Sequence, residues 1–252
     1  MKSILRHRFL WICLSASSPA LLAPGCGTTD WSTKDAVTKA KHVKNLQVKA
    51  NAEFDRYVKS AEDPDGVDES ALLRYVALHK EMTEVHGPQE APRSYANYGA
   101  ALRRLGLHYE TLVTALEESL EAAPGAKQAD IKARITKYTT LQLENFVQSN
   151  RYFTAYIQAI QSGGGTEDAQ VYLWGLRNSQ ALKDWRQAIA YLDQYSTAVL
   201  LNDSQKEEVA AQRKFYQDQL RLLEEEDLRR ELGDDRSSPR ASAGRGAREP
   251  AN

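Results

Sequence analysis

The stretch YANYGAALRRLGLHYETLVTALEESLEAAPG, residues 95–125, contains the signals that decide the fold. Its apolar residues recur every three or four positions, which is the spacing of one face of an α-helix. Gly106 interrupts the pattern, and Pro124 with Gly125 ends it. Because glycine and proline commonly stop helices, we expect two helices joined at Gly106 and a stop at Pro124.

Similar helical stretches, separated by glycine or proline, follow this segment. We expect a second pair of helices at residues 127–149 and 151–161, closed by SGGG at residues 162–165. A third pair is expected at residues 167–182 and 184–200. Three helix pairs in succession therefore follow residue 92.

Longer helices are expected on both sides of these pairs. The apolar spacing predicts one helix over residues 33–61, and a second that is capped by Asp68 and runs to about His86. The last helix is expected to begin at a capping box of Ser204 and Glu207 and to reach about Leu232.

The composition agrees with an all-helical chain. Alanine, leucine, glutamate, glutamine, lysine and arginine dominate, and alternating runs of β-branched residues are hard to find. We therefore predict an all-α fold of tandem antiparallel helix pairs, flanked by long N- and C-terminal helices, with one domain over residues 33–232. The formal net charge is -1, so no overall field attracts nucleic acid.

The helix pairs of residues 92–200 resemble the tetratricopeptide repeat, a pair of helices of about 34 residues in which small and large residues interlock. The first pair carries the resemblance on Tyr95, Tyr98, Gly99, Leu102, Gly106, Tyr109, Val113, Leu116 and Pro124. The second carries it on Tyr152, Ala155, Tyr156 and Ala159. The third carries it on Tyr172, Asp184, Trp185, Ala188, Ile189, Tyr191 and Leu192.

This resemblance implies a right-handed solenoid whose first helices line a groove able to hold an extended peptide or a partner helix. The expected contacts to a protein partner are polar residues off the apolar stripe of those helices: Asn97, Arg104, Gln142, Asn145, Arg177 and Asn178. The aromatic residues Tyr98, Tyr152 and Trp185 are expected in the core.

Residues 1–25 have the layout of a secretory signal, with Lys2, Arg6 and Arg8 before a short apolar run and then small residues. The run is too short to cross a bilayer, which takes about 20 residues. The ending Leu22 to Cys26 resembles a bacterial lipoprotein signal, which implies acyl chains on Cys26 and a membrane anchor. A plain secreted or a cytosolic N-terminus is the alternative.

Two further segments follow from this reading. Residues 26–32 are expected to be a tether, and residues 233–252, which are rich in glycine, proline, serine and arginine, a disordered tail. In bacterial lipoproteins an Asp after the modified Cys retains the protein at the inner membrane. Gly27 therefore favours an exported protein at the outer membrane, facing the periplasm.

No catalytic, cofactor, metal or small-molecule site is predicted. His79 and His86 lie seven residues apart on one expected helix, about 10.5 Å, which is too far for one metal ion. The sequence thus predicts a membrane-tethered, non-enzymatic scaffold that binds another envelope protein, for example in assembly of an envelope complex. A structural periplasmic helical-bundle lipoprotein without a groove, or a helical enzyme with an unrecognised site, remains an alternative.

Overall fold

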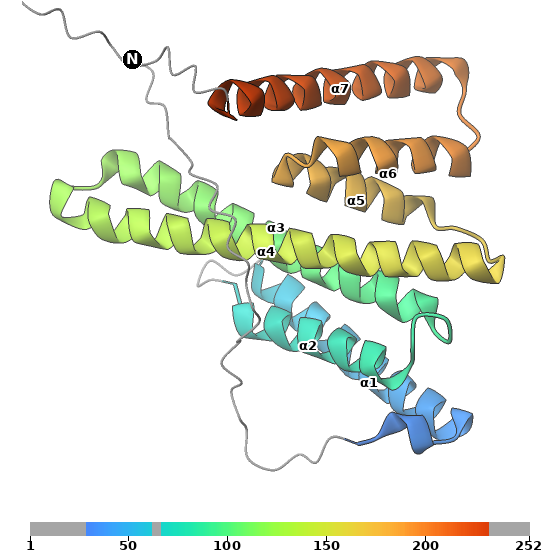
Figure 1. The fold of residues 1–252 in the computed structure, drawn as a ribbon. Coiled ribbons are helices and arrows are strands. Elements are labelled where there is room, and N and C mark those ends of the chain that lie inside the picture. The colour runs from blue at the N-terminus through green and yellow to red at the C-terminus, as the bar shows by residue number, and fades with distance from the viewer. Residues whose placement is uncertain (1–28, 62–66, 232–252) are drawn as a thin grey trace, which may run out of the picture.

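The computed structural model describes residues 29–61 and 67–231 (Figure 1). The elements are η1 (Trp31–Thr33), α1 (Ala36–Ala61), α2 (Glu69–Val85), α3 (Pro92–Ala122), α4 (Gly125–Gly163), α5 (Ala169–Leu182), α6 (Trp185–Ala198) and α7 (Asp203–Glu231). No strand occurs among these residues, so the all-α prediction is confirmed for this part of the chain.

The helices form antiparallel hairpins that are stacked in chain order (Figure 1). Helices α1 and α2 make the first hairpin, α3 and α4 the second, α5 and α6 the third, and α7 covers the open end. Each helix packs mainly on the helix before and after it in the chain, and the interface between α3 and α4 is the most extensive.

The predicted turn at Gly106 is wrong, because this residue lies inside the continuous helix α3. A Cβ on Gly106 would lie 2.6 Å from Cε1 of Phe146, and a Cβ on Gly99 would lie 2.6 Å from Cε1 of Phe153. The two glycines are seven residues apart, as are the two phenylalanines on the antiparallel helix α4. Glycine therefore permits close approach of α3 and α4.

The second predicted pair, residues 127–149 and 151–161, is also wrong, because α4 is one helix of 39 residues. The expected break falls at Ser149 and Asn150, which are buried within the helix. Helix α4 ends at the predicted SGGG segment, where Gly164 adopts a left-handed conformation with φ of 66°. Such a conformation is inexpensive for glycine, which explains the stop.

The third predicted pair is confirmed in α5 and α6. Asp168 accepts a hydrogen bond from the backbone nitrogen of Gln170 at the start of α5, and Asp184 accepts one from Gln187 at the start of α6, each at 3.0 Å. These are N-cap contacts of the usual kind. Asp68 caps α2 in the same way, through the nitrogen of Ala71 at 3.0 Å, as predicted.

Helix α7 begins as predicted, but with a different capping box. The side chain of Asn202 accepts from the nitrogen of Gln205 at 2.9 Å, and the side chain of Gln205 accepts from the nitrogen of Asn202 at 3.0 Å. The predicted pair of Ser204 and Glu207 does not make these contacts. An asparagine and a glutamine three residues apart serve the same purpose, two positions earlier.

Two clusters of buried residues hold the stack together. One lies among α1, α2 and α3 and includes Leu72 and Met82. The other lies among α4, α5, α6 and α7, with Ala96 of α3. Tyr98 is buried, and Tyr152 and Trp185 are partly buried against these clusters, so their placement in the core is confirmed.

The predicted tether is too long, because residues 31–33 form the short helix η1. The ring of Trp31 stacks on that of His42 in α1, with centroids 4.4 Å apart. The predictions for residues 1–25, for Cys26 and for the tail at 233–252 lie outside the described residues. Within the described ranges, no helix is long and apolar enough to cross a membrane.

Candidate functional site

A cluster of buried polar side chains joins α4 to the α5–α6 hairpin. Ser149 and Asn150 of α4 and Asn178 and Ser179 of α5 are each at most 3% exposed. Asn178 Nδ2 donates to Ser149 Oγ at 3.0 Å and to Asn150 Oδ1 at 3.1 Å. Because buried polar groups are costly when unpaired, this network fixes the register of the two helices.

The same cluster also makes hydrogen bonds to α3 and to α6. Ser149 Oγ donates to the backbone oxygen of Gly99 at 2.7 Å. Asn150 Nδ2 donates to Ser179 Oγ at 3.0 Å and to Oε1 of Gln187, in α6, at 2.9 Å. These bonds occupy the donors of Asn150, whereas Oδ1 of Asn178 is buried without a hydrogen-bond partner among the described residues. The cluster therefore serves mainly to join the helices.

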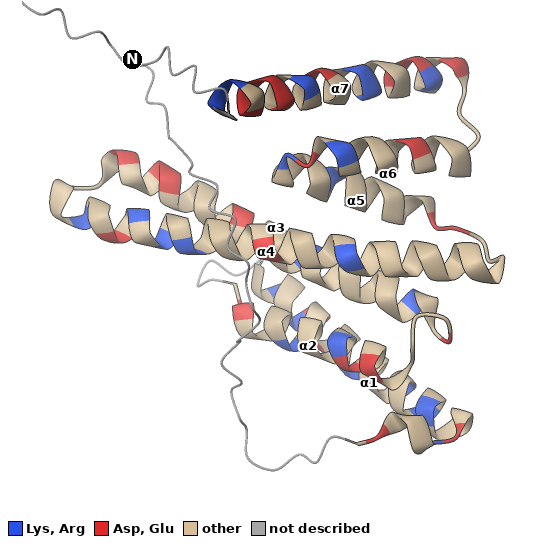
Figure 2. Cartoon of the chain, in the orientation of Figure 1, with Lys and Arg blue, Asp and Glu red and all other residues tan. Residues whose placement is uncertain are grey.

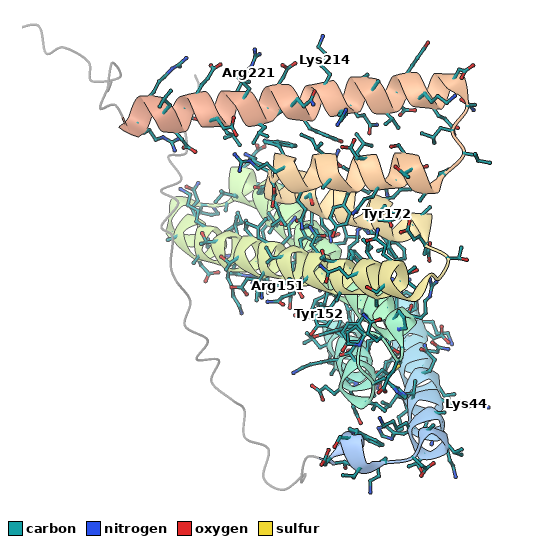
Figure 3. All side chains as sticks on the ribbon, turned by 45° about the vertical axis from the view of Figure 1, so that its right-hand side comes forward. Lys44, Arg151, Tyr152, Tyr172, Lys214 and Arg221 are labelled. Atoms are coloured by element: carbon teal, nitrogen blue, oxygen red, sulfur yellow. The ribbon has the colours of Figure 1, made fainter. Side chains whose placement is uncertain are left out.

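A cleft of about 560 Å³ opens above this cluster, between α4 and the turn from α5 to α6. Its lining consists of Val147, Asn150, Arg151, Thr154, Leu182, Asp184 and Gln187. Figure 3 shows Arg151 on α4. The rim carries charge of both signs, whereas the floor is already hydrogen bonded, so the cleft offers a shallow pocket for a side chain of a partner.

A second candidate lies where α3 approaches α5. Burial, and then the charge of Arg177 on α5, lower the pKa of Arg103 on α3, while Glu110 partly offsets this. Nε of Arg103 is buried without a hydrogen-bond partner. Among the described residues, neither arginine has a carboxylate within 4.0 Å. The two arginines thus come from helices that contact each other, and neither has an ion-pair partner among the described residues, an arrangement suited to binding an anionic group.

The predicted partner contacts are not brought together in one groove. Arg104 points to the first hairpin, where its guanidinium lies 4.2 Å from the ring centroid of Phe54 and donates to Tyr75 Oη at 2.8 Å. Asn178 is 1% exposed, so its prediction as a surface contact is wrong. It occupies an apolar stripe and belongs to the polar cluster.

The other predicted contacts have more accessible positions. Asn97 and Gln142 are partly buried, on α3 and α4, and Arg177 is exposed on α5. Asn145 is partly buried and donates to the backbone oxygen of Leu141 in its own helix, at 2.7 Å. Because α4 is the second helix of its hairpin, Gln142 and Asn145 do not share a layer with the residues of α3 and α5.

Sequence reasoning missed Arg103 and the polar cluster. A signal for the cluster exists, because Ser149 and Asn150 fall between Phe146 and Phe153 at the three- and four-residue spacing of the buried face. A polar residue on such a stripe must find a buried partner. No comparable signal distinguishes Arg103 from Arg104, since their neighbours on other helices decide which one is paired.

Among the described histidines, His79 has the pKa that is shifted furthest from its ordinary value. It is 2% exposed, neither ring nitrogen has a hydrogen-bond partner, and burial, with a smaller contribution from Arg104, lowers its pKa to about 4. The imidazole ring packs edge-to-face against the ring of Tyr75, with the two ring centroids 4.6 Å apart. His79 therefore packs as a neutral core residue. Within the described ranges, no group of three potential metal ligands occurs.

No family model, no curated protein and no solved structure matches this chain.

Proposed function

We propose that this protein is a membrane-tethered, non-enzymatic helical scaffold that binds another protein of the cell envelope, as in assembly of an envelope complex. The observation that carries the proposal is the pair Arg103 and Arg177, which lie on the contacting helices α3 and α5 and have no ion-pair partner among the described residues. The partner contributes a carboxylate, from an acidic side chain or a C-terminus, to this pair.

The stacking of hairpins in chain order supports a solenoid similar to tetratricopeptide repeats. In such a stack, each unit contacts only its neighbours, and the side of the first helices stays open along the whole length. Helices α3 and α5 contact each other directly and are both first helices of their hairpins. The partner therefore lies along α3 and α5, with Asn97 and Arg177 among its contacts.

The anchor of this scaffold is Cys26 carrying acyl chains. Each buried CH₂ adds roughly 0.8 kcal/mol of membrane affinity, so several chains hold a protein permanently. The anchored protein faces the periplasm from the outer membrane. In an envelope fraction washed with high salt, which weakens electrostatic contacts with the bilayer, Cys26→Ala is expected to move the protein from the membrane to the soluble part. Retention of the variant in the membrane would contradict an anchor at Cys26.

Partner binding is tested by crosslinking in intact envelopes, followed by mass spectrometry of the captured proteins. Arg177→Glu is expected to abolish the specific crosslink, because it places a negative charge against the partner's carboxylate. Arg221→Glu is the matched control, since Arg221 is exposed on the outer side of α7 (Figure 3). Equal capture by both variants would contradict the binding site. No capture by the wild-type chain would favour the structural helical bundle instead.

A further inference from the structure

We propose that the outward face of the first half of α1 lies against the anionic lipid headgroups of the membrane. This basic face consists of Lys41 and Lys44 with Val37 and Val48, and Lys49 lies beside it, one residue after Val48. The inference goes beyond the proposed scaffold function, because it assigns the chain a second membrane contact and an orientation. The inference depends on the proposed anchor in one respect: the anchor brings the N-terminal side of the molecule to the bilayer.

The charge of this face has one sign. Residues 36–52 contain four lysines and no carboxylate. Lys41, Lys44 and Lys49 are exposed, and within the described residues none of them has a carboxylate within 4.0 Å. Helix α7 differs, because lysine, arginine, aspartate and glutamate alternate along its whole length (Figure 2).

The acidic residues that approach α1 from neighbouring elements are already paired. Glu81 of α2 contacts His42 at 2.9 Å, and Glu90 of the segment between α2 and α3 contacts Lys39 at 3.5 Å. Asp35 caps the start of α1 through the nitrogen of Thr38 at 2.9 Å. The outward lysines therefore keep their charge available to an external anion.

Two valines accompany Lys41 and Lys44 on the same face. Residues 37, 41, 44 and 48 recur at intervals of three and four, so they lie on one side of the helix. Val37 is 78% exposed and Val48 is 63% exposed. Figure 3 shows Lys44 pointing away from the body of the molecule.

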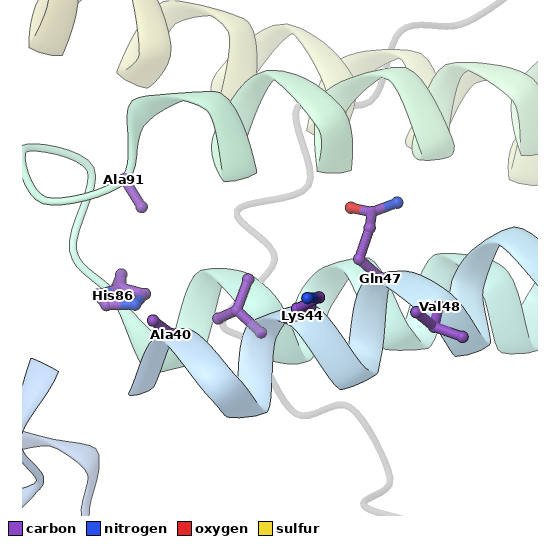
Figure 4. Close-up of a pocket in the computed structure, with 7 residues that line it drawn as sticks. Ala40, Lys44, Gln47, Val48, His86 and Ala91 are labelled. Atoms are coloured by element: carbon purple, nitrogen blue, oxygen red, sulfur yellow. The ribbon is translucent and has the colours of Figure 1, made fainter. Parts of the chain in front are cut away.

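A groove of about 580 Å³ adjoins the basic face, between α1 and the segment that follows α2 (Figure 4). Its lining is mainly apolar: Ala40, Val43, Lys44, Gln47, Val48, His86 and Ala91. Exposed valines beside lysines are typical of a helix that lies in the membrane interface, where apolar groups enter the headgroup region and lysine stems extend to the phosphates. Charge complementarity thus selects an anionic bilayer as the occupant.

The position of the basic face agrees with this occupant. Cys26 precedes Asp30, which directly precedes η1, by four residues. An extended chain spans at most about 3.6 Å per residue, so an acylated Cys26 would hold η1 within roughly 15 Å of the bilayer surface. Helix α1 begins three residues after the end of η1, and a lipid anchor there would raise the effective concentration of headgroups at the basic face.

The test uses the full chain with Cys26→Ala, which removes the anchor but leaves the face intact. Sedimentation with vesicles of phosphatidylcholine and phosphatidylglycerol is compared with sedimentation with phosphatidylcholine alone. We expect binding to the anionic vesicles that weakens with salt. Replacing Lys41, Lys44 and Lys49 together by Gln should weaken it by more than ~10-fold, because each lysine near an anionic surface contributes roughly 5-fold.

The matched control replaces Lys127, Lys132 and Lys214 by Gln, three exposed lysines of α4 and α7. This variant is expected to bind anionic vesicles like the parent chain, and circular dichroism checks that all variants stay helical. Equal loss in both triple variants, or equal binding of the parent chain to neutral vesicles, would overturn the proposal. Failure of the parent chain to bind anionic vesicles would also overturn it, while leaving partner capture and the anchor unaffected.

Discussion

Single residues decide how closely the helices approach, and glycine shows this most directly. Inside a helix, glycine costs roughly 0.5 to 1 kcal/mol relative to alanine, so its presence at Gly99, Gly106 and Gly175 needs a reason. Each of them meets an aromatic ring of the neighbouring helix: Phe153, Phe146 and Tyr191 respectively. The absence of a side chain is therefore offset by closer packing of α3 on α4 and of α5 on α6.

Replacing Gly99 by alanine should destabilise the protein despite the better helix propensity of alanine. The new Cβ would lie 2.6 Å from the Phe153 ring and 3.2 Å from the backbone oxygen of Ser149, which cannot move without displacing α4. Overpacking of this kind costs about 1 to 3 kcal/mol. The free energy of unfolding, measured in urea, should fall by that amount.

Gly163 supplies the control for this experiment. It ends α4, and a Cβ there would meet nothing within 4 Å. Gly163→Ala should leave the free energy of unfolding within roughly 0.5 kcal/mol of the wild-type value. If Gly99→Ala proved as stable as Gly163→Ala, the close approach of α3 and α4 at that point would be refuted.

Burial of a neutral histidine makes stability depend on pH. In the unfolded chain His79 has its ordinary pKa near 6.5, and in the folded chain the pKa is about 4. Between these values the unfolded chain binds a proton that the folded chain does not, so stability falls as the pH decreases. The expected loss from pH 7.5 to 4.5 is about 2.5 kcal/mol from this residue.

Replacing His79 by leucine removes this titration and keeps an apolar group of similar size beside Tyr75. Urea unfolding of both proteins at a series of pH values should show the wild type losing stability more steeply below pH 6.5. Carboxylates titrate in both proteins, so only the difference between the two curves reports on His79. Parallel curves would mean that folding leaves the pKa of the imidazole at its ordinary value.

At the scale of elements, the sequence predicted helices and most of their ends. Asp68, Gly164 and the Pro124–Gly125 stop act locally, through caps and backbone preferences, and local signals can be read without tertiary structure. Gly106 and Ser149 act through a neighbouring helix, which the sequence does not place. For that reason α3 and α4 were each expected as two helices.

The residues of the candidate site show the same difference between local signals and contacts with other helices. Arg177 was predicted as an exposed polar residue and is exposed, because one side of a helix can be assigned from periodicity. Arg103 was missed because the burial of its Nε without a hydrogen-bond partner depends on how other helices pack against α3. Asn178 was misassigned because a polar residue on the apolar stripe was placed on the surface, whereas Ser149 and Asn150 supply it with buried partners.

The capping box of α7 gives a prediction at this scale. Asn202→Ala removes the acceptor of the Gln205 nitrogen and should lower stability by about 1 kcal/mol. Ser204→Ala should have little effect, because the observed reciprocal contacts join Asn202 and Gln205. Thermal unfolding of the two variants shows which of the two capping boxes, Asn202 with Gln205 or Ser204 with Glu207, stabilises the helix. A larger loss for Ser204→Ala would support the box with Glu207 instead.

In the whole molecule, the helices are stacked in chain order, so the free energy of folding comes mainly from the interfaces between neighbouring helices. Helix α7 lies at one end, and residues 221–230 are exposed throughout. Tyr216 holds the helix in place: it is 2% exposed, its hydroxyl contacts Gln180, and its ring stacks on Trp185 with centroids 5.8 Å apart. Opening of α7 should therefore leave the first hairpin folded.

Tyr216→Ala tests this property by hydrogen exchange. Loss of a buried aromatic ring costs about 3 to 5 kcal/mol, so amides of α7 and of the adjoining α6 should exchange much faster. Protection in α1 and α2 should stay unchanged, because these helices share no contact with the altered site. Phe215→Ala, at an adjacent and 54% exposed residue, is the control and should have a smaller effect.

The outcome of that experiment separates a solenoid from a single bundle. In a solenoid the destabilised end opens alone, since interface energies between neighbouring units add along the stack. In a bundle with one cooperative core, Tyr216→Ala would lower protection by the same free energy in α1, α4 and α7. Uniform loss would therefore contradict the stack of semi-independent hairpins. Loss confined to α7 and α6 would leave α3 and α5 able to hold a partner while the end of the molecule frays.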